Sequence, residues 1–264
     1  RQDSFVAQKK KQWVDSVFNR LTPRERLGQL MMIGVYTHLP DTHRVNLTKI
    51  LKKYQIGGLI CMRGYVDKQI QWTNQFQKLT KVPIMMGMDA EWGLGMRLKN
   101  MMDFPFQMTL GAIRDDSLIY QMGAQIAQQM KRIGVHINFA PVVDVNINRI
   151  NPVIGYRSFS ENREKVARKG IAYMKGLQDY GIQANAKHFP GHGDTGTDSH
   201  YALPVIKHDS ARLDSIELYP FKQLIKNGVK SIMVAHLNLP AYDPAKNRPT
   251  TNASASYDCS SAAA

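Results

Sequence analysis

Short apolar runs alternate with helical patterns along most of this chain. Six runs have the length and composition of buried strands, and stretches with apolar residues three and four positions apart separate them. No hairpin signal joins one run to the next. Because strands linked by helices form parallel sheets with crossover connections, the alternation predicts an α/β fold, for which a (β/α) barrel is the natural closure. The predicted strands are 30–36, 56–62, 84–88, 135–145, 182–186 and 232–239.

Capping signals place several of the helices between these strands. The clearest is Thr22 followed by Pro23 and Glu25, which predicts a helix that begins with a capping box. An amphipathic helix is expected before it, at residues 3 to 20, with Val6 on its apolar face. The other predicted N-caps are Asp115 or Asp116, Ser160 and Asp209, and the helix after Asp209 is expected to continue to Asn227-Gly228.

The composition fits one large domain, because 264 residues with 43% hydrophobic content can bury a substantial core. No run approaches the roughly 18 consecutive apolar residues of a transmembrane helix. The first residues lack the apolar core of a secretory signal. The two cysteines, Cys61 and Cys259, imply no disulfide framework.

The formal net charge of +14 favours an anionic partner, such as nucleic acid, a membrane surface or an acidic polymer. Much of this charge lies on predicted helices, where Lys165 and Lys169, for example, are expected on solvated faces. The sequence has no RNA-binding or zinc-finger pattern, so nucleic acid is not a predicted partner. An anionic polysaccharide such as peptidoglycan fits the charge equally well.

The densest chemistry lies in residues 187–200, directly after a predicted strand. This segment holds three histidines, two aspartates, a lysine and three glycines. The glycines allow the positive φ angles that a mobile loop uses. Asp198 and His200 are two positions apart, close enough for the carboxylate to hold one imidazole nitrogen and raise the pKa of the ring toward the working pH. This pair is a candidate general acid/base.

Two other interpretations of the same segment stay open. His188, His192 and His200 are suitable zinc ligands, although the nearby glycines argue against the fixed geometry of a closed metal site. The polar residues could also make purely structural contacts. Substitution of His200 separates these possibilities, because a zinc site would lose metal whereas an acid/base site would lose turnover. We predict no metal and no cofactor.

The segment also carries a family resemblance. Lys-His-Phe-Pro-Gly-His-Gly-Asp-Thr at 187–195, followed by Asp-Ser-His at 198–200, resembles the signature loop of family 3 glycoside hydrolases, in particular the bacterial β-N-acetylglucosaminidase branch. The resemblance implies a (β/α)8 TIM-type barrel. It also implies that His200 is the catalytic acid/base with Asp198 as its partner, and that Lys187 and His188 bind sugar hydroxyls.

Two further segments resemble the same family. In 151–159 the resemblance implies that Arg157 grips the sugar, although a lone arginine more commonly forms a surface ion pair. In 89–97 it implies that Asp89 binds sugar hydroxyls. Here the chain departs from the family, because Trp92 stands where the first of two adjacent glycines is usual, and its indole would stack on a pyranose face or narrow the pocket. The ends of barrel strands converge on one face, so residues far apart in sequence can meet there.

The nucleophile that a retaining glycosidase requires has no clear candidate in the sequence. In the family it is an aspartate at a later strand end, and no apolar strand can be drawn through residues 241–264. Asp243 and Asp258 lie there, but the first is in a proline-flanked loop and the second is in a tail without family resemblance. We expect residues 1–251 to be an incomplete N-terminal barrel domain without its last two β/α units, and residues 252–264 to be an anomalous low-complexity tail. Either the chain is a fragment of a longer enzyme, or the final strands come from elsewhere.

The predicted function is removal of terminal β-linked N-acetylglucosamine from cell-wall fragments or related glycans by a retaining mechanism, so the predicted partner is a carbohydrate substrate. One alternative is a β-N-acetylglucosaminide phosphorylase, because a histidine acid/base avoids like-charge repulsion with phosphate. The other is a non-catalytic glycan-binding barrel, which would explain the missing nucleophile. The expected compartment is the bacterial cell envelope or periplasm, with the cytoplasm as the alternative.

Overall fold

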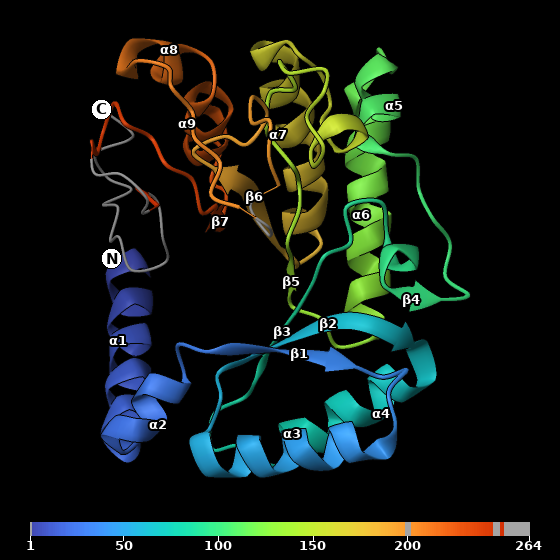
Figure 1. Ribbon diagram of the computed structural model, residues 1–264. Coiled ribbons are helices and arrows are strands. Elements are labelled where there is room, and N and C mark those ends of the chain that lie inside the picture. Colours follow the sequence, from blue (N-terminus) through green and yellow to red (C-terminus); the bar gives the residue numbers. More distant parts are fainter. Residues whose placement is uncertain (1, 199–201, 245–248, 251–264) are drawn as a thin grey trace. The chain divides into compact units, whose positions relative to one another are not determined.

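The computed structural model describes residues 2–198, 202–244, 249 and 250, and Figure 1 shows its helices and strands. These residues group into two compact units. The N-terminal unit consists of the described residues up to Met88 together with Arg97–Asn100, and the C-terminal unit consists of Asp89–Met96 and the described residues from Met101 onward. No helix in the described ranges combines the length and the apolar character that crossing a membrane requires.

The N-terminal unit is built on parallel strands. β1 (Met32–Tyr36) pairs with β2 (Gly58–Tyr65), β2 pairs with β3 (Met85–Met88), and the short β4 (Leu98–Lys99) also pairs with β2. Leu59 of β2 is fully buried, as expected for an apolar residue of a parallel strand. The helices of this unit are α1 (Gln2–Arg20), α2 (Pro23–Gly28), α3 (Asp41–Tyr54) and α4 (Val66–Gln77).

The start of this unit follows the sequence signals. Thr22 Oγ1 accepts a hydrogen bond from the amide of Glu25 at 3.3 Å, and Glu25 Oε2 accepts one from the amide of Thr22 at 2.9 Å, so the capping box is confirmed. The amphipathic helix expected before it is α1. Two of its apolar side chains are largely exposed in the part of the chain that the structure describes: Val6 is 62% exposed and Trp13 is 58% exposed.

The C-terminal unit also contains parallel strands. β6 (Gln183–Phe189) pairs with β5 (Ile137–Asn138) on one side and with β7 (Ser231–Val234) on the other. Beyond β5, Val142 forms an isolated parallel bridge with Lys187 of β6. The helices are α5 (Gln107–Ala112), α6 (Asp116–Arg132), α7 (Arg163–Asp179), α8 (Ser210–Ser215) and α9 (Leu218–Lys226), and the 3-10 turns are η1 (Leu94–Met96) and η2 (Gly155–Arg157).

Helices α6 and α7 approach each other closely. A Cβ atom on Gly176 of α7 would lie 2.2 Å from the carbonyl oxygen of Tyr120 in α6, so this approach requires glycine.

Near the start of α6, the Lys169 side chain is fully buried, and its Nζ lies 2.8 Å from Asp116 Oδ1 and donates to the carbonyl oxygen of Ile113. The prediction that Lys169 lies on a solvated face was therefore wrong, because an ion pair between the two helices compensates its burial.

The capping predictions for the C-terminal unit have mixed outcomes. Asp115 caps α6, and Asp209 caps α8 by accepting from the amide of Arg212. The cap of α7 is Asn162 instead of Ser160, because Asn162 Oδ1 accepts from the first turn of the helix at 2.7 Å.

Proline accounts for two differences between prediction and structure. The strand predicted at 135–145 is regular only over β5, because Pro141 has no amide hydrogen to donate to a strand ladder. The long helix predicted after Asp209 is divided into α8 and α9. Pro220 lies in the first turn of α9, where a continuous helix would need an amide donor that proline lacks.

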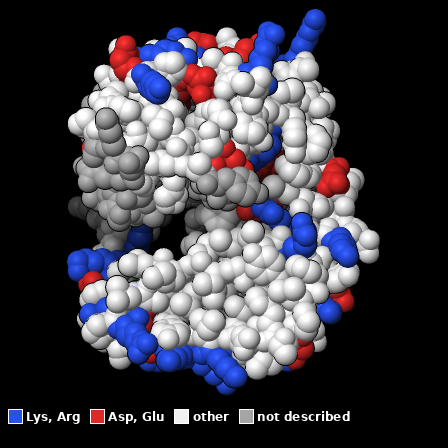
Figure 2. Space-filling view, in the orientation of Figure 1, with Lys and Arg blue, Asp and Glu red and all other residues white. Residues whose placement is uncertain are grey.

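Basic side chains lie on many elements of the described chain. Figure 2 shows the Lys and Arg side chains of one face in separate groups, with Asp and Glu side chains among them. Among the described residues, several basic side chains form ion pairs near the surface, for example Arg168 with Asp116 and Arg163 with Glu164. The positive charge is thus partly neutralised locally, as is usual for solvated helix faces.

Candidate active site

Ionisable side chains from separate segments of the C-terminal unit meet close to β5 and β6. Parallel strands that lie side by side bring together residues that follow them or end them, even when these residues are distant in sequence. The set consists of Asp89 and Glu91 from the segment Asp89–Met96, Asp144 after β5, Arg157 of η2, and Lys187 and His188 of β6.

Lys187 lies at the centre of these contacts. Its Nζ atom is 2.8 Å from Asp89 Oδ1 and 2.7 Å from Glu91 Oε1, and its side chain is 2% exposed. A lysine this deeply buried needs a partner of opposite charge. The two carboxylates supply it, and they tie β6 to the segment that begins this unit.

Glu91 also forms a bidentate contact with Arg157. Arg157 Nη2 donates to Glu91 Oε1 at 2.7 Å and Arg157 Nε donates to Oε2 at 2.9 Å, which is the bidentate geometry that arginine offers to carboxylates. Burial alone would raise the pKa of Glu91, but the charge of Lys187 and the hydrogen bonds of Arg157 outweigh it and lower the pKa to about 2. Glu91 therefore stays ionised and holds two cations at fixed positions.

Asp144 organises the end of β6. Its Oδ2 accepts from His188 Nδ1 at 2.7 Å, and its Oδ1 accepts from the amide of His192 at 2.6 Å. Burial opposes ionisation of this fully buried carboxyl, but His188 and the amide of His192 together lower its pKa. Because Asp144 can only accept, the hydrogen-bond partners assign a proton to His188 Nδ1. The Nε2 atom of His188 lies 3.4 Å from Arg157 Nη2.

Exposure divides the six residues into two groups. The side chains of Asp89, Arg157 and His188 keep 17%, 19% and 17% of their surface exposed. Those of the other three, Lys187, Glu91 and Asp144, keep 2% or less. A ligand in solution can therefore reach the first three, while the buried three hold them in place. Such a set of fixed donors and acceptors is suited to hydrogen bonding with hydroxyl groups.

His192 is buried beside this set. Its ring centroid lies 6.1 Å from that of His188, and its Nδ1 is hydrogen-bonded to Thr195 Oγ1 at 2.6 Å. Its Nε2 atom is buried without a hydrogen-bond partner among the described residues. Burial is the largest influence on the pKa of His192 and lowers it, whereas the charges of Asp144 and Asp198 act in the opposite direction.

The structure brings together four of the six residues predicted from the sequence. Asp89, Arg157, Lys187 and His188 are in one connected network. Asp198 is half-buried, and its charge reaches His192. His200 lies outside the described residues, so its pairing with Asp198 stays a prediction. Asp258, one of the two weak nucleophile candidates, also lies outside them.

Sequence reasoning missed the part played by two buried acids. Neither Glu91 nor Asp144 is among the site residues predicted from the sequence. A usable signal exists for Glu91, because it lies two positions after Asp89 in a segment that follows a strand. The need of Lys187 and Arg157 for a shared carboxylate appears only in the folded chain.

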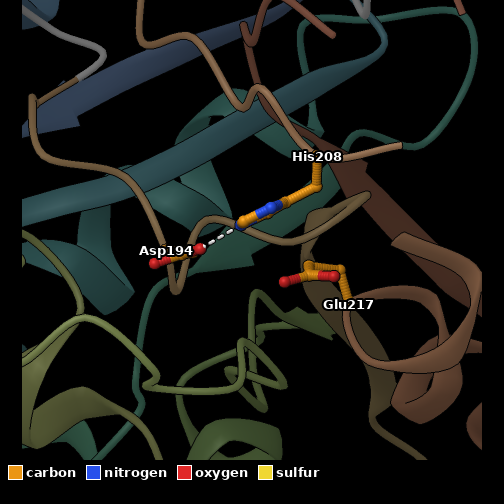
Figure 3. Close-up of side chains that lie close together, drawn as sticks. All are labelled: Asp194, His208 and Glu217. Carbon is orange, nitrogen blue, oxygen red and sulfur yellow. Dashed lines mark hydrogen bonds and ion pairs between the residues drawn. The ribbon is translucent and has the colours of Figure 1, made fainter. Parts of the chain in front are cut away.

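Of the three histidines in the zinc interpretation, His188 and His192 have their Nδ1 atoms engaged by Asp144 and Thr195. A histidine can still bind a metal through Nε2 in that state, and His200 lies outside the described residues, so this interpretation stays untested. A different group, Asp194, His208 and Glu217, has donor atoms within 4.8 Å of one another and is drawn in Figure 3. His208 Nε2 donates to Asp194 Oδ2 at 2.5 Å.

Parallel strands, helical connections and charged side chains gathered at strand ends are the features of a (β/α) barrel domain. Comparison with known proteins agrees: residues 22–257 match the model of the glycosyl hydrolase family 3 N terminal domain. The chain belongs to this family, and its fold class is the α/β TIM-type barrel.

Individual relatives are consistent with this assignment. The beta-hexosaminidase A of Pseudoalteromonas piscicida is 32% identical over 86% of this chain and 42% of its own length. Among solved structures, a family 3 beta-N-acetylglucosaminidase from Paenibacillus sp. FPU-7 is 38% identical with a TM-score of 0.79, covering 87% of this chain and 44% of that one. NagZ from Neisseria gonorrhoeae, solved with N-trifluoroacetyl-D-glucosamine, is 28% identical with a TM-score of 0.73, covering 83% of this chain and 66% of that one. The chain thus spans about half the length of the first two relatives.

Proposed function

We propose that the protein containing this chain hydrolyses terminal β-linked N-acetylglucosamine from cell-wall fragments or related glycans, with retention at the anomeric carbon. The observation that carries the proposal is the network in which buried Lys187 and Glu91 fix the partly exposed Asp89 and Arg157. Sugar hydroxyls both donate and accept, so a carboxylate beside a guanidinium is a matching surface. A relative with an N-acylated glucosamine bound supports the choice of sugar.

We assign the residues as follows. Asp89, Arg157 and His188 bind the hydroxyls of the terminal sugar. Lys187, which lies between the carboxylates of Asp89 and Glu91, holds this binding surface in place. His200 protonates the leaving group and later activates water, with Asp198 as the partner that keeps the imidazole protonated for the first step. The nucleophile is left unassigned.

The test is hydrolysis of 4-nitrophenyl N-acetyl-β-D-glucosaminide by the full-length protein and by its H200A variant. We expect H200A to lose most activity on an alkyl N-acetylglucosaminide and much less on the 4-nitrophenyl substrate, because a good leaving group needs little protonation. Proton NMR of the first-formed sugar should show the β anomer. Equal losses on both substrates would refute the role of His200, and an α product would refute retention.

The alternatives have their own signatures in the same assay. A rate that requires phosphate, with a sugar phosphate as product, would indicate the phosphorylase. Binding of N-acetylglucosamine without turnover would indicate the non-catalytic barrel.

We propose the cell envelope or periplasm as the compartment, because peptidoglycan fragments arise there and the chain is strongly basic. Fractionation with compartment markers tests this against the cytoplasm.

A further inference from the structure

Two buried polar side chains of the C-terminal unit contact the backbone between Asp89 and Glu91. Asn138 belongs to β5 and Tyr173 to α7, and both residues are fully buried. A polar group is costly to bury unless it is hydrogen-bonded. The hydrogen-bond partners of these two side chains therefore identify the part of the chain that each one supports.

Asn138 pairs with both backbone groups of a single residue, Ala90. The amide nitrogen of Ala90 donates to Asn138 Oδ1 at 3.0 Å, and Asn138 Nδ2 donates to the carbonyl oxygen of Ala90 at 3.2 Å. A backbone N–H can only donate and a carbonyl can only accept, so the pairing uses both ends of the Asn138 amide. The two residues are 48 positions apart, so this side chain ties β5 to the segment that begins the unit.

Tyr173 contacts the same stretch of backbone. Its hydroxyl oxygen lies 3.0 Å from the carbonyl oxygen of Ala90 and 3.1 Å from that of Glu91. Burial and the charge of Glu91 raise the pKa of Tyr173, so the hydroxyl keeps its proton and donates. The Ala90 carbonyl also accepts from the amide of Gly93 at 3.2 Å. It therefore has several donors, whereas within the described ranges the Ala90 amide has only Asn138 as its acceptor.

The two peptide groups of Ala90 connect the two carboxylates that hold Lys187. One peptide group joins Ala90 to Asp89 and the other joins it to Glu91, and each is a rigid plane. Asn138 holds the N–H of the first plane and the C=O of the second. It thereby restricts the backbone torsions that direct the side chains on either side of Ala90.

We propose that Asn138 is a positioning residue for the sugar-binding surface, acting through the backbone of Ala90 to hold the Asp89 carboxylate in place. The inference rests on the proposed function, because it needs Asp89 to bind a sugar hydroxyl. Without Asn138 the Ala90 amide would be buried with no acceptor, and the backbone would have to shift to find one. A misplacement of about 1 Å can lower a rate about 100-fold.

The competing explanation is that Asn138 only stabilises the fold. Other contacts do support this segment: Arg157 holds the Glu91 carboxylate, and the amide of Phe104 donates to the carbonyl oxygen of Trp92 at 2.8 Å. These contacts lie after Ala90 in the chain, and neither engages its amide. We therefore expect loss of Asn138 to displace Asp89 more than Glu91, which gives the two explanations different consequences for sugar binding.

The experiment compares N138L, D89A and the double variant D89A/N138L in the full-length protein with the 4-nitrophenyl N-acetylglucosaminide. Leucine keeps a branched side chain but can neither donate nor accept. We expect N138L to lower kcat/KM by about 10- to 100-fold. In the double variant it should add less than about 3-fold to the loss caused by D89A, because residues that act through one another are not additive. Y173F should cost less than about 3-fold, since the Ala90 carbonyl keeps its other donors.

N185L is the matched control, because Asn185 is a buried asparagine of the neighbouring strand β6 whose Nδ2 donates to Ser231 Oγ at 3.0 Å. It measures how far the same substitution lowers kcat/KM without removing a contact to Ala90. Each variant is assayed at a temperature at which circular dichroism shows it to be folded. A loss in N138L no greater than that in N185L would overturn the positioning role.

Asn138→Asp adds a readout that is independent of N138L and decides the question if N138L does not fold. A protonated carboxyl can accept from the Ala90 amide and donate to its carbonyl, as asparagine does, whereas a carboxylate can only accept. The ratio of kcat/KM in N138D to that in the wild type should rise toward one as pH falls. A ratio near one at every pH also supports the role, because burial favours the protonated form. A ratio that stays low at every pH contradicts it.

The outcomes separate this inference from the proposed function. Fully additive losses in D89A/N138L would overturn the positioning role of Asn138 while leaving Asp89 as a sugar-binding residue. If D89A itself leaves kcat/KM unchanged, the assignment of Asp89 under the proposed function fails first.

Discussion

Replacement of Glu91 by glutamine tests the central claim about the site, that a buried carboxylate holds its two cations in place. The substitution keeps the shape of the side chain and one acceptor oxygen. It removes the negative charge that lies 2.7 Å from Lys187 Nζ and accepts two hydrogen bonds from Arg157. Both cations would then be left with less compensation in a region where their side chains are only 2% and 19% exposed.

The size of the effect follows from the pKa. An ordinary glutamate has a pKa of 4.5, and Lys187 and Arg157, acting against burial, lower that of Glu91 to about 2. Linkage converts this difference into about 3 kcal/mol of stability at pH 7. Removal of one partner of a buried ion pair typically costs about 3 to 5 kcal/mol. We therefore expect E91Q to lower the free energy of unfolding by about 3 kcal/mol.

The assay is urea unfolding at a series of pH values, with E161Q at an exposed position as the control. A group whose folded pKa is depressed stabilises the protein above its unfolded pKa, and this stability is lost as pH falls from 4.5 toward 2. About 1 kcal/mol of the difference between wild type and E91Q should be gone at pH 3.5. A difference below about 1 kcal/mol at pH 7, or one that stays constant down to pH 3.5, would refute the argument.

Three further expectations concern the same unit. Asp144→Asn should lower kcat/KM by about 10- to 100-fold in the 4-nitrophenyl assay. An amide has one acceptor oxygen, so it cannot replace both Asp144 oxygens, one of which accepts from His188 Nδ1 and the other from the amide of His192. Asn162→Ala should cost about 1 kcal/mol in chemical denaturation through loss of the α7 cap, and a neutral result would contradict the cap assignment. Trp92→Ala removes the edge-to-face contact with Phe106, whose ring centroid is 4.9 Å away. It should lower the free energy of unfolding by about 1 kcal/mol beyond the loss of buried area. A melting temperature equal to that of the wild type would count against that contact.

Much of the fold could be predicted because its signals are local. Each of the six predicted strands overlaps a strand of the structure, and the cap residues Thr22, Asp115 and Asp209 mark helix starts as expected. The elements that escaped prediction are short: β4 has two residues and α5 has six, too few to show a period.

The site shows where sequence reasoning stops. Asp89, Arg157, Lys187 and His188 were predicted from a family resemblance, and the structure joins them. The resemblance did not reveal that Glu91 neutralises two of them or that Asp144 orients a third. These roles depend on which charged side chains lie next to each other in the folded protein. Segments far apart in the sequence determine those contacts. The same holds for Lys169, whose partner Asp116 lies in another helix.

The contact between Glu91 and Arg157 also bears on how the protein is made. The two residues are 66 positions apart, and Lys187 is 98 positions from Asp89. At a synthesis rate of about 5 to 20 residues per second, Arg157 leaves the ribosome roughly 3 to 13 s after Glu91. During that interval the newly made acidic segment has neither of its basic partners and must remain hydrated. Completion of the proposed sugar-binding network therefore has to wait until Lys187 has been synthesised.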